Sequence, residues 1–237
     1  MKMENKLNIT ETIIEAAKLG VKNILHLLIA VILYGLTIWI PYLNVGTTIG
    51  MYKLIVLLSK GKMADPLSIF DKENFEKIGD FFLFQGLQTI GITAAMIFMF
   101  VPAMIMSIAW QFAIYFLIDK GTSPLKSLSL SYDATYGEKW RIFGALAVFG
   151  ILVSILSTIF AFIPKVGFVF VILIVIVASA AYVALIAVMY RHFAEKADAI
   201  LAGKPACCCK AEAPAEAPAV EEPAAEEPKA EEIENKE

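Results

Sequence analysis

Charged residues are scarce in this chain, and they are unevenly distributed. Only 18% of its 237 residues are Asp, Glu, Lys or Arg, against about 25% in soluble domains. Four segments contain none of them: residues 23–52, 81–118, 142–164 and 166–190. The hydrophobic fraction is 59% and the mean hydropathy is +0.71. These values exclude an ordinary soluble domain and predict an integral membrane protein.

Residues that carry chemistry are also sparse. No Asp or Glu is expected deep inside a span, which argues against proton- or sodium-coupled transport. The chain contains no Walker loop, nucleophile elbow, HExxH or dinucleotide-binding fingerprint. Its two histidines, His26 and His192, are far apart in the sequence and are expected at the membrane interface. We therefore expect no catalytic residues, no cofactor, no metal and no nucleic-acid partner.

Cysteine occurs only as the run Cys207-Cys208-Cys209. Reduced, solvated thiols are the expected state, with lipidation, redox chemistry or soft-metal capture as alternatives. Residues 204–237 contain 4 Lys and 10 Glu, giving this tail a charge of −6 and the remainder +3. Residues 194–237 are predicted to form a cytoplasmic tail, disordered from about 204 because too little apolar surface is available to form a core. The tail is either a solvated spacer or an acidic binding site for a protein partner.

The uncharged runs predict the number of spans. A bilayer core requires roughly 20 helical residues, so the run 81–118 should form two spans, with Pro102 at the break. Pro41, Asn44 and Gly46 predict a turn in the first run, followed by a short span that contains Lys53. The predicted fold is all-α, with six transmembrane helices in three hairpins, at about 24–42, 45–59, 81–101, 103–118, 142–163 and 167–190. Five spans result if 45–59 only dips into the interface.

The distribution of basic residues predicts the orientation. With six spans, both termini and the loops around 60–80 and 120–141 share one side, which holds nearly all Lys and Arg, whereas Lys165 lies on the other. Because basic loops stay inside, we expect a multi-pass protein of the cell (plasma or inner) membrane with both termini cytoplasmic. No cleavable signal peptide is recognised. The expected interface anchors are Trp39, Tyr42, Trp140, Arg141 and Arg191.

Amphipathic segments precede each predicted hairpin. Residues 1–22 should form an interfacial helix, with Asn8 and Glu11 spaced as a capping box. Ser123 and Pro124 should begin another such helix, and Gly137 should follow it in a left-handed conformation. Gly20, Gly79 and Gly137 recur at nearly equal spacing, and Lys-Gly and Pro-Leu pairs recur near 60 and 120. We interpret this recurrence as three units, each an amphipathic helix, a glycine and a helical hairpin.

Several short motifs resemble a known group of proteins. They are Gly50-Met51-Tyr52-Lys53-Leu54, Ser59-Lys60-Gly61, Ile69-Phe70-Asp71, Phe116-Leu117-Ile118-Asp119, Pro124 to Leu128, Gly137 to Trp140 and Met189-Tyr190-Arg191. From Gly46 to Phe193 the chain is similar to six-helix prokaryotic membrane proteins of unknown function, related to the membrane domain attached to some glycerophosphodiester phosphodiesterases. The resemblance implies architecture and location. No phosphodiesterase domain is present, so no enzymatic activity follows.

Polar side chains inside the spans form a candidate polar path. Gln85, Gln88 and Thr89 share a face of the third predicted span, and Gln111 lies in the fourth. Lys53 is the one charge within a span. The alternatives are hydrogen bonding between helices for the glutamines and snorkelling of Lys53 to the interface. Small residues also recur every four positions, which favours close helix packing and allows a homo-oligomer. These are Gly46 and Gly50; Gly150, Ser154 and Thr158; and Ala180 and Ala184.

The sequence thus predicts a non-enzymatic membrane protein that organises or accommodates membrane lipids or protein partners. A small channel or facilitator for a polar solute is the alternative, and it rests on the glutamine and threonine face and on Lys53.

Overall fold

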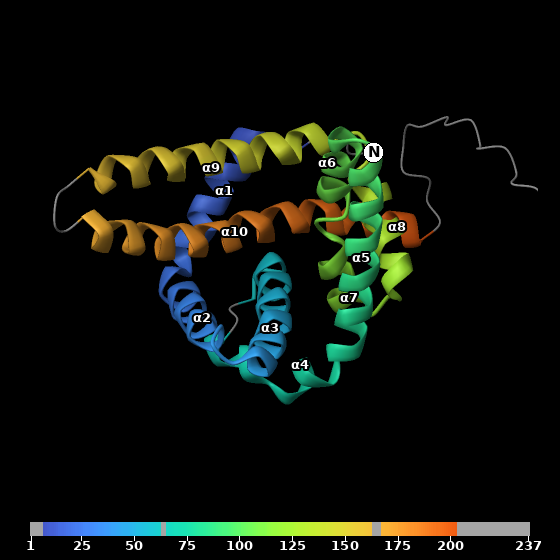
Figure 1. Cartoon of the computed structure of the whole chain (residues 1–237), viewed down its shortest axis with the longest axis horizontal. Helices are drawn as coiled ribbons and strands as arrows, with labels where there is room; N and C mark the ends of the chain where they lie inside the picture. The colour runs from blue at the N-terminus through green and yellow to red at the C-terminus, as the bar shows by residue number, and fades with distance from the viewer. Residues whose placement is uncertain (1–6, 63–64, 163–166, 203–237) are drawn as a thin grey trace, which may run out of the picture. The chain divides into compact units, whose positions relative to one another are not determined.

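The computed structural model describes residues 7–62, 65–162 and 167–202. Every regular element within these ranges is helical, as the sequence predicts (Figure 1). In chain order they are α1 Ile9–Lys22, α2 Ile24–Thr37, α3 Pro41–Ser59, η1 Pro66–Phe70, α4 Lys72–Glu76, α5 Ile78–Phe98, α6 Phe100–Ala109, α7 Ala113–Lys120, α8 Pro124–Ala134, α9 Lys139–Ala161 and α10 Gly167–Leu201.

Four described helices are long and apolar enough to cross a membrane. They are α5, the stretch Phe100–Lys120 formed by α6 and α7, α9, and α10. The α1–α2 pair becomes a fifth candidate if it is counted as one span with a bend of 83°. The structure therefore supports a membrane protein with four or five candidate spans, fewer than the six that the sequence predicts.

The first uncharged run differs most from its prediction. A span was expected over residues 24–42, but the helix there, α2, ends at Thr37. Its 14 residues extend about 21 Å, which is shorter than a bilayer core. The chain turns at residues 38–40, and Pro41 begins α3 because proline suits the first helical position. Asn44 and Gly46, which were expected in the turn, lie inside α3. The predicted span 45–59 is the remainder of this helix, which is not among the candidate spans.

Helix α3 is largely buried by the protein itself. The atoms nearest to its Gly46–Gly50 pair belong to η1 and α4. A Cβ at Gly50 would lie 2.5 Å from the Cα of Ile69, and one at Gly46 would lie 2.3 Å from the Phe75 ring. The prediction of close packing at these glycines is thus confirmed. Its partner is the short segment that follows α3.

The long run 81–118 divides into two candidate spans, but the break is not at Pro102. Met99 is extended, with φ −168° and ψ 153°, and it separates α5 from α6. Pro102 is the third residue of α6. A missing N–H is tolerated in the first turn of a helix because no carbonyl precedes it to accept the bond.

A second interruption, at residues 110–112, separates α6 from α7. It leaves the Ala109 carbonyl without a regular helical bond, although Ala109 is fully buried. The Ser131 hydroxyl of α8 donates to this carbonyl at 2.6 Å, and the hydroxyl of Thr135, the C-cap of α8, donates to it at 3.4 Å. Irregular backbone at membrane depth requires such partners. Helix α8 therefore packs its hydroxyl face against the interruption.

The amphipathic segments are helical, but the proposed repeat holds only in part. Ser123 and Pro124 begin α8, and Gly137 has φ +79°, as expected. Asn8 is the N-cap of α1, yet its side chain makes no capping bond to the backbone. Gly20 lies inside α1, where a Cβ would be 3.5 Å from that of Ala184, and Gly79 lies inside α5. Neither glycine ends a helix.

Helices α9 and α10 lie side by side (Figure 1). Gly150, Ser154 and Thr158 of α9 are exposed, so this small-residue stripe has no packing partner among the described residues. Ala180 and Ala184 of α10 are buried. The predicted span 167–190 is part of α10, which continues to Leu201. The cysteine run and the acidic tail lie outside the described residues.

Candidate functional site: a polar cavity between the spans

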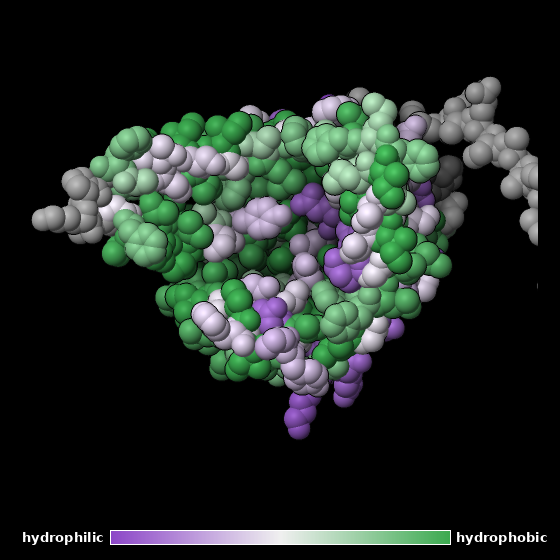
Figure 2. All heavy atoms as spheres, in the orientation of Figure 1, coloured by the Kyte–Doolittle hydropathy of each residue, from purple (hydrophilic) through white to green (hydrophobic). Residues whose placement is uncertain are grey.

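The three glutamines of the predicted polar path line one cavity, here called the central cavity. Its volume is about 300 Å³. It lies between α3, α5, the α6–α7 interruption and α10, and it appears in Figure 2 as a hollow with paler and purple surfaces inside a green rim. The lining residues are Tyr52, Phe84, Gln85, Gln88, Ser107, Gln111, Ile114, Tyr115 and Tyr182.

All three glutamines lie near the middle of candidate spans. Gln85 and Gln88 are the eighth and eleventh of the 21 residues in α5. Gln111 lies in the interruption between α6 and α7, where its side chain hydrogen-bonds with the Tyr182 hydroxyl of α10. Trp110, beside it, packs on Gly91, since a Cβ there would lie 2.5 Å from the ring. The close approach at Gly91 holds the interruption against α5.

The lining of the central cavity is polar but carries no formal charge. Its hydrogen-bonding groups are three amides, three phenols and one hydroxyl, alongside Phe84 and Ile114. Gln85 is exposed on the protein surface, and Gln88 and Gln111 are half-buried. The cavity can therefore donate and accept hydrogen bonds, but none of its lining side chains carries a charge that could neutralise a charged ligand.

Thr89 does not line this cavity, and neither does Lys53, contrary to the predicted path. The Lys53 ammonium lies 2.9 Å from a carboxylate oxygen of Glu73 in α4. The hydrogen bond and charge of Lys53 lower the pKa of Glu73. The charge within α3 is thus paired with the short segment that packs on that helix.

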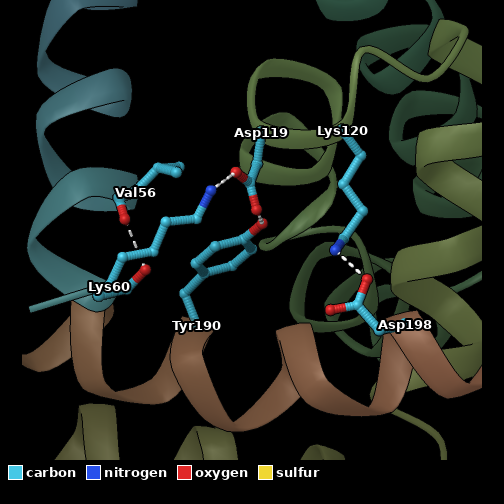
Figure 3. Close-up of polar contacts among 7 residues, drawn as sticks. Val56, Lys60, Asp119, Lys120, Tyr190 and Asp198 are labelled. Atoms are coloured by element: carbon cyan, nitrogen blue, oxygen red, sulfur yellow. Dashed lines mark hydrogen bonds and ion pairs between the residues drawn. The ribbon is translucent and has the colours of Figure 1, made fainter.

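A second cavity lies further along the same helices and is here called the charged pocket. Its volume is about 600 Å³. The Asp119 carboxylate accepts hydrogen bonds from the Tyr190 hydroxyl at 2.8 Å and from the Lys60 ammonium, and Lys120 pairs with Asp198 (Figure 3). The residues that line it are Ser59, Lys60, Gly61, Asp119, Lys120, Tyr190, Arg191, Ala194, Glu195 and Asp198.

Glu138 is the centre of another charged cluster, at the start of α9. Its side chain is 6% exposed and contacts Lys196, the Nε2 of His192 at 3.3 Å, and the backbone N–H of Leu7 at 3.1 Å. Burial alone would raise the pKa of Glu138, but these hydrogen bonds outweigh it and lower the pKa to about 2. The carboxylate remains ionised and joins the N-terminal segment to α10.

The predicted anchors differ in their surroundings. Trp39 and Trp140 are exposed, at 90% and 72%, and Tyr42 is exposed beside the Phe75 ring. Arg141 donates to the Leu7 carbonyl at 3.3 Å, and Arg191 pairs with Glu15. The aromatic side chains are thus available to a membrane interface, whereas both arginines also hold α1 or the segment before it. Among described residues, no group suited to a metal ion is found.

Sequence reasoning did not assign a role to Asp119, Tyr190 or the tyrosines of the central cavity. One signal was present. The motifs Ser59-Lys60-Gly61, Ile118-Asp119 and Tyr190-Arg191, noted for their resemblance to other membrane proteins, all contribute to the charged pocket. Their convergence depends on helix packing, which the individual motifs do not reveal.

No protein-family model, curated protein or solved structure matches this chain.

Proposed function

We propose that this protein is a non-enzymatic integral membrane protein that accommodates a neutral, hydrogen-bonding molecule in its central cavity. The observation that carries the proposal is the meeting of Gln85, Gln88 and Gln111 in one cavity at mid-span. These residues come from two candidate spans, and the Tyr182 hydroxyl of a third joins them.

Physical chemistry favours an occupied cavity. Moving an amide or hydroxyl from water into hydrocarbon without a partner costs about 4–8 kcal/mol. The protein does not bury the side chain of Gln85, which lies near the middle of a candidate span. Without an occupant in the cavity, this amide would be surrounded by lipid tails. An occupant with hydroxyl groups satisfies such amides, whereas an ion would find no opposite charge in the lining.

The class of occupant is therefore an uncharged polyhydroxy group. It can be the headgroup of a neutral glycolipid that enters from the bilayer, or a free polyol. If the occupant is a glycolipid, the protein accommodates lipid. If the occupant is a polyol, the protein is a facilitator for a small solute.

For topology we retain the six-helix arrangement in three hairpins with both termini cytoplasmic. Under this proposal α1–α2 and α3 form the first hairpin, with α3 shielded from lipid by its neighbours. The charged pocket then faces the cytoplasm, in keeping with the positive-inside rule. The exposed stripe of α9 is available to a second copy of the chain, and the acidic tail to a protein partner.

Reconstitution tests the proposed function. The chain, the double variant Gln88→Met and Gln111→Met, and the control Thr89→Val would be placed in phosphatidylcholine nanodiscs doped with galactosyldiacylglycerol. Thr89 is exposed on α5 next to Gln88 but does not line the cavity. Lipid retained after exchange into pure phosphatidylcholine would be quantified by mass spectrometry. A parallel arm would measure glycerol entry into proteoliposomes by light scattering.

We expect the parent chain and the control to retain glycolipid or to admit glycerol, and the double variant to lose that property about tenfold. Glycolipid retention identifies a lipid occupant, and glycerol entry identifies a solute. If the double variant matches its parent in both arms, the proposed function is wrong.

A further inference from the structure

Three helices, α3, α7 and α10, contribute to both the central cavity and the charged pocket. Tyr52 of α3, Tyr115 of α7 and Tyr182 of α10 line the cavity. Four to eight residues further along each helix, Lys60, Asp119 and Tyr190 line the pocket. At about 1.5 Å per residue, this spacing corresponds to roughly 6–12 Å. The two spaces are therefore neighbours, although α10 runs across α3 and not parallel to it (Figure 1).

One pair of aromatic rings stands between them. Tyr115 lines the central cavity, Tyr190 lines the charged pocket, and their ring centroids are 5.4 Å apart. Tyr115 is 5% exposed and Tyr190 is fully buried. Phe116 packs against Tyr190 at 5.3 Å, and Tyr52 contacts Tyr115 at 5.4 Å. The barrier between the two spaces is thus about one ring contact thick.

A carboxylate holds the Tyr190 ring in this position. Asp119 accepts the hydroxyl hydrogen bond at 2.8 Å on one oxygen and the Lys60 ammonium on the other. Its side chain is 5% exposed. Figure 3 shows the three side chains from α3, α7 and α10 pointing toward one another. Hydrogen bonds to a charged group are stronger than neutral ones, so the ring cannot turn aside without losing a strong contact.

The cations of the charged pocket are engaged by carboxylates and helix ends. Lys60 is the C-cap of α3 and Lys120 is the last residue of α7, where a positive charge complements the helix dipole. Lys60 pairs with Asp119 and Lys120 with Asp198. A pocket whose cations already have partners is better suited to the passage of a neutral group than to anion binding.

We propose that the central cavity and the charged pocket are two parts of one passage for a neutral polar molecule, closed between Tyr115 and Tyr190 and held shut by the bond from Tyr190 to Asp119. This inference rests on the proposed function and extends it from holding a molecule to moving one. Opening requires the Tyr190 ring to leave Tyr115 while α3, α7 and α10 stay in place.

Cysteine labelling tests the passage without knowledge of the natural occupant. Cys207, Cys208 and Cys209 would be replaced by serine, and Gln88→Cys would place one thiol in the central cavity. The full chain would be held in nanodiscs, which leave both membrane sides accessible. The probe is a glucosyl methanethiosulfonate, which is neutral and polyhydroxylated like the proposed occupant, is water-soluble and does not cross lipid.

Two substitutions are designed to open the barrier by different amounts, and a third serves as a matched control. Tyr190→Phe removes the hydroxyl and keeps the ring, whereas Tyr190→Leu removes the ring. Phe193→Leu alters another fully buried aromatic residue of α10, which packs on Phe112 and lines neither space. Thermal unfolding and size-exclusion chromatography would confirm that all three variants are folded.

The parent in this experiment is the chain with Gln88→Cys and the three serine replacements. We expect its labelling rate to be low, Tyr190→Phe to raise the rate about tenfold and Tyr190→Leu to raise it further. Phe193→Leu should leave the rate unchanged. Equal rates in the parent and both Tyr190 variants would overturn the passage, as would an equal rise in Phe193→Leu. Rapid labelling of the parent would show that Tyr190 is no barrier. If the occupant is retained but labelling is unchanged, the cavity is a closed binding site and the proposed function stands alone.

Discussion

Glu138 accepts a hydrogen bond from the backbone N–H of Leu7 at 3.1 Å, although the two residues are 131 positions apart in the sequence. The same carboxylate contacts Lys196 and His192 of α10. One buried carboxylate therefore joins the N-terminal segment, the start of α9 and the end of α10. Arg141 strengthens this junction by donating to the carbonyl of Leu7.

Glu138→Ala is expected to destabilise the protein by about 3 kcal/mol, because breaking a buried charge pair leaves its partner uncompensated. Glu138→Gln keeps an acceptor for Leu7 but loses the charge, and should cost about 1–2 kcal/mol. Thermal unfolding in detergent measures both. Glu76→Gln, at an exposed position in α4, is the control. If Glu138→Ala unfolds at the temperature of the control, the junction has no stabilising role.

The low pKa of Glu138 predicts a pH dependence of known sign. The pKa falls from the ordinary 4.5 to about 2 on folding. The carboxylate therefore contributes its full stabilisation above about pH 4.5 and loses it as the pH falls toward 2. The difference in unfolding temperature between the parent and Glu138→Gln should be constant from pH 5 to 7 and narrow below 4.5. A difference that grows on acidification contradicts this assignment.

The hydroxyl of Ser131 should stabilise the interruption between α6 and α7. Ser131→Ala removes the 2.6 Å bond to the Ala109 carbonyl and should cost about 1–3 kcal/mol, since a buried carbonyl loses its partner. The second hydroxyl, on Thr135, compensates in part, so adding Thr135→Val should cost more than the two single effects combined. Ser129→Ala, at an exposed position of the same helix, is the matched control. Additive effects in a double-mutant cycle would exclude shared support of this carbonyl.

Gly50 is predicted to tolerate no side chain. Gly50→Ala places a Cβ 2.5 Å from backbone atoms of Ile69, and the resulting shift should cost about 1–3 kcal/mol. Gly86→Ala in α5 meets nothing within 4 Å and should be neutral, or stabilising by about 0.5–1 kcal/mol. The comparison of the two unfolding temperatures separates packing from helix propensity. Equal shifts would mean that η1 does not pack on α3 as described.

Local signals predicted the long apolar helices well. The expected span 142–163 overlaps α9, and the start of α8 and the left-handed Gly137 follow from residue preferences alone. The bend between α1 and α2, the burial of α3 and the break at Met99 were missed. The burial of α3 depends on contacts with other segments, as when η1 packs on Gly50. Nothing in the structure explains the break at Met99, where Phe98, Met99 and Phe100 are all exposed. Hydropathy reports whether a residue suits an apolar environment, but not whether lipid or protein supplies that environment.

The candidate site was predicted in part for the same reason. Helical spacing placed Gln85 and Gln88 on one face, and the structure brings Gln111 to them. Lys53 was assigned to the path because it is charged within a predicted span. Its partner Glu73 lies in α4, part of a segment expected to be an amphipathic helix, and the sequence does not reveal that this segment packs on α3. The tyrosines were not singled out, because an aromatic residue in a span is ordinary until its hydroxyl meets a partner.

Native mass spectrometry from membrane vesicles tests the central claim most directly, because it reports what the central cavity holds without a chosen probe. The account predicts one neutral, hydroxyl-bearing molecule bound per chain in the parent and in Thr89→Val, and its loss when Gln88 and Gln111 are both replaced by methionine. The same adduct on the double variant, or bare protein from all three, would contradict it.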